Sequence, residues 1–168
     1  MNPRRVLFVC TGNICRSAMA EAIASTMHRD SGVSFSSAGL LAGEGERATS
    51  TAVAVCAEVG VDAEAHRSRR LDRRMAESAD RIYVMTAEHL ERVLAMAPEA
   101  AHKTEMLHPD GADIEDPYGQ PASVYRACFE EIAAALEARR PLSNLRTLLH
   151  RASRDEITAA VEERSKDW

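Results

Sequence analysis

One short segment near the start of the chain, CTGNICRS at residues 10–17, has the residue types needed to hold a phosphate and to attack it. Cys10 is a potential nucleophile, and Arg16 offers a planar guanidinium whose N–H groups match two phosphate oxygens. Gly12 permits close approach of the backbone to a ligand, and Asn13 tolerates left-handed backbone angles. The segment therefore predicts a phosphate-binding loop with a cysteine at its floor.

A second segment, DPYG at residues 116–119, supplies a candidate acid. A thiolate displaces phosphate from an ester only if the leaving oxygen is protonated, and a carboxylic acid can give that proton and later activate water. Pro117 restricts Asp116 to an extended backbone, which keeps its side chain out of a helix. Tyr118 is expected at the rim of the site, where it can stack against an aromatic substrate.

The elements beside the cysteine segment are expected to place it where open α/β sheets bind ligands. Residues 6–10 form a continuous apolar run typical of a buried parallel strand, and residues 17–28 carry apolar side chains at helical spacing. A loop between the two collects unpaired N–H groups and the positive end of the helix dipole. The same field favours a Cys10 thiolate, to which Ser17 is able to donate a hydrogen bond.

The rest of the chain alternates predicted strands and helices. Strands are expected at residues 6–10, 32–39, 81–85 and 103–107, and helices at residues 17–28, 48–59, 72–79, 87–97 and 122–139. Repeated β-α units predict a single three-layer α/β domain with a four-stranded, mainly parallel sheet and helices on both faces. The last of these helices is expected to face the core with one stripe of side chains: Val124, Phe129, Ile132 and Leu136.

With these segments the chain resembles the low-molecular-weight protein tyrosine phosphatase family. The likeness runs from about residue 6 to about residue 138 and includes the cysteine loop, SSAG from Ser36, HRSRRL from His66, ADRIYVMT from Ala79 and DPYG. It implies a phosphatase-like catalytic domain at residues 1–140, followed by a helical extension of unknown role at residues 141–168.

The resemblance also implies roles for individual residues. Cys10 would be the nucleophile, Arg16 the phosphate clamp and Asp116 the general acid. The other loop residues would bind phosphate: Thr11, Gly12, Asn13, Ile14, Cys15 and Ser17. Ser37 and His66 would support the loop through hydrogen bonds by way of Asn13. Members of the family with a second cysteine at the Cys15 position can form a protective disulfide with the nucleophile.

The family divides into a tyrosine branch and a bacterial arginine branch. Three residues expected at the rim of the site, Ile14, Thr86 and Tyr118, do not all resemble the same branch. The arginine branch has threonine before the second cysteine, whereas this chain has Ile14, an apolar wall suited to an aromatic ring. Thr86 and the lone aromatic Tyr118 look more like the arginine branch. Because Ile14 would touch the reacting group, the residues favour protein phosphotyrosine, with a protein-arginine phosphatase as the alternative.

Two further interpretations fit less well. An arsenate reductase on this scaffold needs extra cysteines in a mobile segment, and residues 80–100 contain none. A silent phosphate-binding module would keep Arg16 but lose Cys10 or Asp116, and both are present.

Composition limits the partners. A net charge of −5 predicts no general attraction to nucleic acid or anionic membranes, and an aromatic content of 4% argues against a base-stacking surface. Residues 1–10 are too short an apolar segment for a signal peptide, so a cytoplasmic location is expected. No metal constellation or cofactor motif is present in the sequence. The expected partner is a phosphorylated protein, with inorganic phosphate as product.

Overall fold

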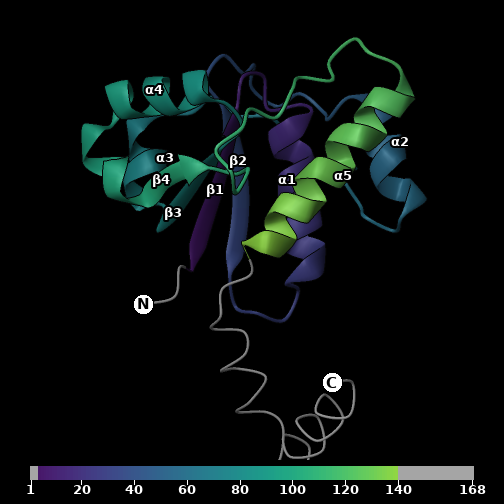
Figure 1. Cartoon of the computed structure of the whole chain (residues 1–168), viewed down its shortest axis with the longest axis horizontal. Helices are drawn as coiled ribbons and strands as arrows, with labels where there is room; N and C mark the ends of the chain where they lie inside the picture. Colours follow the sequence, from purple (N-terminus) through teal and green to yellow (C-terminus); the bar gives the residue numbers. More distant parts are fainter. Residues whose placement is uncertain (1–3, 140–168) are drawn as a thin grey trace, which may run out of the picture. The chain divides into compact units, whose positions relative to one another are not determined.

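The computed structural model describes residues 4–139, which form four strands and five α-helices (Figure 1). The strands are β1 (Arg5–Cys10), β2 (Ser34–Gly39), β3 (Arg81–Val84) and β4 (Thr104–Met106). The helices are α1 (Arg16–Met27), α2 (Ser50–Glu58), α3 (Arg73–Ser78), α4 (Ala87–Met96) and α5 (Ala122–Ala138), with a 3-10 turn, η1 (Pro98–Lys103), before β4. The predicted extension at residues 141–168 lies outside the described residues.

The four strands form one sheet in the order β2-β1-β3-β4, and every pairing is parallel. The predicted fold class is therefore confirmed. The chain leaves β1 to form β2 on one side and later returns to form β3 on the other side. The carboxyl end of β1 is thus the point where strand order reverses, which is where open α/β sheets bind their ligands.

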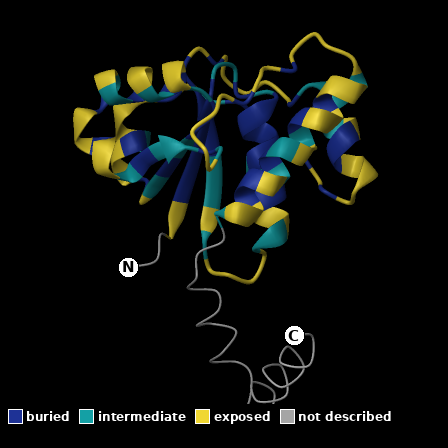
Figure 2. Cartoon of the chain, in the orientation of Figure 1, coloured by how far each residue is buried: buried dark blue, intermediate teal, exposed yellow. Residues whose placement is uncertain are grey.

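Helices cover both faces of the sheet, and each face has its own core (Figure 2). Successive side chains of a strand point to opposite faces, so Phe8 of β1 packs with α1 and α5 while its neighbour Val9 packs with α4. Ile82 of β3 joins Val9 on the α4 face. The continuous apolar run of β1 follows from this two-sided burial.

The buried stripe of α5 differs from the predicted one at its start. Val124 is 39% exposed, and Tyr125 is buried in its place. Ile132 and Leu136 face the core as predicted. The hydroxyl of Tyr125 contacts Cys15, just before α1, and Thr49, just before α2. Tyr125 lies three residues before Cys128 and seven before Ile132, so helical spacing places it on the buried face, where its hydroxyl has polar partners.

Candidate active site

The loop between β1 and α1 curls at Asn13, whose φ of 56° lies in the left-handed region. Its side-chain amide is held on three sides. Nδ2 donates to Ser17 Oγ at 2.8 Å and to Ser37 Oγ at 2.9 Å, and Oδ1 accepts from the Arg69 backbone N–H at 3.0 Å. These bonds offset the cost of the left-handed backbone and fix the turn.

The curled loop surrounds a cavity of about 190 Å³ with its own backbone. Within residues 4–139, four of its N–H groups have no hydrogen-bond acceptor: those of Thr11, Gly12, Ile14 and Cys15. Helix α1 starts at the end of this loop without a side-chain cap, whereas Thr49 and Asp72 cap α2 and α3. Uncapped donors and the helix dipole together favour an anion in this cavity.

Cys10 lies at the floor of the cavity with 2% of its surface exposed. Its sulfur is 2.8 Å from Ser17 Oγ and accepts a bond from the Asn13 backbone N–H at 3.3 Å. Ser17 Oγ already accepts from Asn13 Nδ2, so its own proton is free to point at the sulfur. Two donors thus converge on Cys10 Sγ, an arrangement that stabilises a thiolate.

Arg16 is 4% exposed and enters the same cavity from the first turn of α1. Its Nη1 donates to the Ile114 carbonyl at 2.9 Å, and its Nη2 lies 3.4 Å from Asp116 Oδ2. Its Nε has no hydrogen-bond partner among the described residues. A buried donor without an acceptor costs free energy, and an anion in the cavity could supply that acceptor.

Asp116 and Tyr118 line the mouth of the cavity. The carboxylate of Asp116 is half-exposed, and its Oδ1 accepts from the Tyr118 N–H at 3.1 Å. That short turn fixes the Asp116 side chain relative to the Tyr118 backbone. The structure therefore brings Asp116, Arg16 and Cys10 to one cavity although they come from distant parts of the chain.

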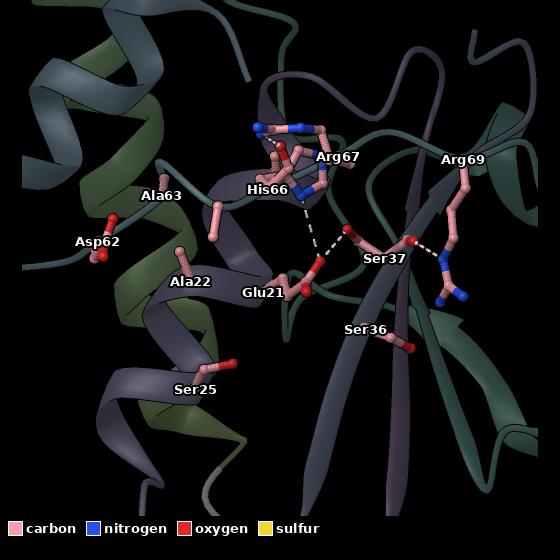
Figure 3. A pocket seen from close by; sticks show the side chains of 12 residues that line it. Glu21, Ala22, Ser25, Ser36, Ser37, Asp62, Ala63, His66, Arg67 and Arg69 are labelled. Carbon is pink, nitrogen blue, oxygen red and sulfur yellow. Dashed lines mark hydrogen bonds and ion pairs between the residues drawn. The ribbon is translucent and has the colours of Figure 1, made fainter. Parts of the chain in front are cut away.

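Behind the loop, Ser37 and His66 both contact Asn13, as the resemblance implied. Ser37 Oγ accepts from the side chain of Asn13, and His66 Nε2 lies 2.6 Å from the Asn13 carbonyl oxygen. Glu21, which the sequence did not single out, joins the two residues: it accepts a short hydrogen bond from Ser37 and lies 3.6 Å from His66 Nδ1 (Figure 3). These three residues line a second cavity of about 360 Å³, whose lining includes no residue of the loop at 10–17.

Cys15 also lines the cavity, and its thiol contacts a buried hydroxyl network. Its sulfur lies 3.3 Å from Tyr125 Oη and 3.7 Å from Thr49 Oγ1. Burial raises the pKa of Cys15 and raises the pKa of Tyr125 to about 12, so both groups are neutral near pH 7. Cys10 and Cys15 are free thiols in this structure, and the disulfide stays a prediction.

Of the three rim residues, Ile14 and Tyr118 line the cavity and Thr86 does not. Thr86 instead precedes α4, where its hydroxyl accepts a hydrogen bond from the His89 backbone N–H at 3.1 Å. The side chain is thereby committed to capping the helix. Thr86 therefore lies outside the lining of this cavity, and its place at the rim of the substrate site stays a prediction.

The sequence also did not indicate the importance of Gly39 at the end of β2. A Cβ at this position would come within 2.6 Å of the Thr11 carbonyl oxygen and 2.9 Å of the Asn13 nitrogen. The catalytic loop can lie against β2 only because this residue has no side chain.

Residues 4–139 hold no cluster of three or more histidine, cysteine or carboxylate side chains suited to a metal ion. No helix in this range has the length and apolar composition needed to cross a bilayer.

Known proteins match most of the length of this chain. The family model described as low molecular weight phosphotyrosine protein phosphatase matches residues 5–148. A protein-arginine-phosphatase of Geobacillus stearothermophilus is 39% identical over 139 residues, covering 80% of this chain and 93% of the relative. The low molecular weight protein-tyrosine-phosphatase Wzb of Escherichia coli K12 is 36% identical over 126 residues, covering 74% of this chain and 84% of the relative.

A solved structure is also similar to this chain in sequence and fold. Vibrio vulnificus Wzb in complex with benzylphosphonate is 32% identical and has a TM-score of 0.76, with 80% of this chain and 94% of that chain covered.

Proposed function

The chain belongs to the low molecular weight phosphotyrosine protein phosphatase family, and on that premise we propose that it hydrolyses phosphotyrosine in proteins through a phosphocysteine at Cys10. The observation that carries the proposal is the convergence of Cys10, Arg16 and Asp116 on one cavity lined by unpaired N–H groups. A phosphoryl group bound there would meet a nucleophile, a cation and an acid together.

The first step transfers the phosphoryl group to sulfur. The Cys10 thiolate attacks phosphorus, an S–P bond forms as the P–O bond to tyrosine breaks, and Asp116 gives its proton to the leaving oxygen. The loop N–H groups and Arg16 stabilise the charge on the transferring oxygens, with Arg16 Nε among the available donors.

The second step releases inorganic phosphate. Water attacks the phosphocysteine, the Asp116 carboxylate takes a proton from that water, and the S–P bond breaks to return the thiolate. The hydrogen bond from Ser17, 2.8 Å from the sulfur, stabilises the departing thiolate. The reaction needs no metal, and a reducing, cytoplasmic location that keeps Cys10 a free thiol is part of the proposal.

Ile14 and Tyr118 support the preference for phosphotyrosine. Both line the cavity that contains Cys10, so an aromatic leaving group would lie against an apolar side chain and a tyrosine ring. The related Vibrio vulnificus Wzb is known in complex with benzylphosphonate, which also joins an aromatic ring to a phosphorus oxyanion.

Protein phosphoarginine is the second candidate substrate, because the Geobacillus stearothermophilus relative named as a protein-arginine-phosphatase is 39% identical. The deciding experiment measures kcat/KM on two peptides of one sequence, one with phosphotyrosine and one with phosphoarginine. Cys10→Ser serves as the blank.

We expect the phosphotyrosine peptide to be preferred and Cys10→Ser to bind inorganic phosphate without turnover. A preference for phosphoarginine would overturn the role given to Ile14. Activity at the level of the blank on both peptides would overturn the phosphatase and leave a phosphate-binding module.

A further inference from the structure

His89 contacts the catalytic loop from the side of the sheet opposite α1. It lies in the first turn of α4 with 4% of its surface exposed. Its Nε2 is 2.9 Å from the hydroxyl of Thr11, the residue that follows Cys10. Helix α4 packs on β3 and β4, so this bond ties the loop to a core other than the one behind α1.

Thr11 is held at two points. Its carbonyl oxygen accepts from the Leu41 backbone N–H at 2.9 Å, and its hydroxyl meets His89. The Cys10 carbonyl, which shares a peptide plane with the Thr11 N–H, accepts from the Leu40 N–H at 3.0 Å, so these contacts together fix the direction of the Thr11 N–H. That N–H is one of the unpaired donors that line the cavity.

The first turn of α4 also holds the segment that carries Asp116. The Ala87 N–H donates to Asp113 Oδ1 at 2.8 Å, and the Ile114 N–H donates to the Met85 carbonyl at 2.8 Å. The first turn of α4 therefore contacts both the catalytic loop, through His89, and the acid segment, through Ala87, while Met85 just before the helix adds a second bond to that segment.

We propose that His89 is a positioning residue, which rests on the proposed function of the Cys10 site. Its imidazole holds Thr11 so that the loop N–H groups and Asp116 keep one geometry relative to each other during phosphoryl transfer. Small displacements of groups around a reacting centre cost much of the rate, so a single fixed contact can matter for turnover.

The charge state of His89 suits a fixed contact. Burial, followed by the positive charge of Arg16, lowers the pKa of His89 to about 4, against opposing effects of Asp113 and Asp116 and a small lowering by Arg92. The imidazole is therefore neutral from about pH 5 upward. Its Nδ1 has no partner among the described residues. Of the two ring nitrogens, the unprotonated one is better able to stay without a partner. Nδ1 is therefore unprotonated, and Nε2 carries the proton and donates it to the Thr11 hydroxyl.

The test compares His89→Leu, which removes the donor, with His89→Gln, whose amide reaches the position of Nε2. Thr11→Val removes the partner hydroxyl at nearly equal volume, and the double variant Thr11→Val, His89→Leu closes the cycle. The measurements are kcat and KM on the phosphotyrosine peptide, the pH profile of kcat/KM and the thermal midpoint Tm.

We expect His89→Leu to lower kcat roughly tenfold, as loss of one well-placed hydrogen bond does, with KM nearly unchanged. His89→Gln should recover most of that loss, and the double variant should be no worse than the poorer single variant. The pH profile should keep its shape between pH 5 and 8, because His89 does not titrate there.

Other results would overturn the proposal. They are an unchanged kcat in both His89→Leu and Thr11→Val, losses that multiply in the double variant, or a shifted pH profile. If His89→Leu does not fold, Thr11→Val and His89→Gln still decide the question. Turnover by the unaltered protein upholds the proposed function even where the role of His89 fails.

Discussion

The guanidinium of Arg16 is fixed before any anion binds. Nη1 donates to the Ile114 carbonyl and Nη2 faces Asp116, so two contacts hold the planar group in place. Less side-chain entropy then has to be lost when phosphate arrives. The same contacts hold the segment of Asp116 at the mouth of the cavity. One residue thus serves both the anion site and the placement of the acid.

The role of Asp116 can be tested by its dependence on the leaving group. Asp116→Asn keeps an oxygen for the Tyr118 N–H but has no proton to give, so kcat on the phosphotyrosine peptide should fall about 10²- to 10³-fold. With 4-nitrophenyl phosphate, whose leaving group needs little protonation, the loss should be much smaller. Steady-state kinetics on both substrates measures the difference.

Asp110→Asn is the matched control, because Asp110 is an exposed carboxylate in the same segment and lies outside the cavity lining. Its kinetics should stay within about twofold of the parent protein, as expected for a surface change. Equal losses on both substrates in Asp116→Asn would contradict proton donation to the leaving oxygen.

The sequence could predict those site residues whose chemistry lies in consecutive positions. Residues 10–17 and the Asp116-Pro117 pair were identifiable because the residue types themselves limit the reaction. Glu21 and His89 were not, because their partners Ser37 and Thr11 lie far away in the chain. The sequence offers only a weak indication of Glu21 and His89, namely that each polar side chain shares a helix face with buried apolar residues.

At the scale of the elements, strands and long helices follow from burial on one or both sides, which apolar patterns report directly. The details that the patterns missed depend on tertiary contacts. One exception is Tyr125, which replaces Val124 in the buried stripe of α5 because it lies seven residues before Ile132 on the same helix face, and its hydroxyl has partners in Thr49 and Cys15. Thr86 caps α4, a role that its place before a helix allows but does not require.

The contact between β2 and the catalytic loop gives a prediction at this scale. Gly39→Ala places a methyl group against backbone atoms of Thr11 and Asn13, so the loop has to move. A displacement of about 1 Å costs on the order of 10²-fold in rate, so kcat/KM on the phosphotyrosine peptide should fall by about that factor. Circular dichroism should show that the fold persists.

Gly43→Ala is the control for this change. Neither Gly39 nor Gly43 has a positive φ, so neither substitution strains the backbone. At Gly43 the new methyl group meets only the flexible end of the Glu46 side chain, at 2.7 Å from Oε1, which can move away. Its kcat/KM should stay near that of the parent protein. Full activity in Gly39→Ala would show that the loop does not depend on this close approach.

On the scale of the whole described domain, the two faces of the sheet share β1 but have separate cores. Ile132 of α5 and Val93 of α4 are fully buried, one in each core. The alanine substitutions Ile132→Ala and Val93→Ala should each lower the free energy of unfolding, by about 2–5 kcal/mol for the isoleucine and about 2 kcal/mol for the valine. Because they share no neighbours, the double variant should show the sum within about 0.5 kcal/mol.

The catalytic loop gives this stability experiment a functional readout. Arg16 belongs to the helix on one face, and His89, which contacts Thr11, belongs to the helix on the other. Unfolding of either core should therefore abolish turnover and helix content together in one transition. Urea unfolding followed by circular dichroism and by residual activity checks this point. If activity disappears before helix content in either variant, the cores unfold separately and the loop depends on only one of them.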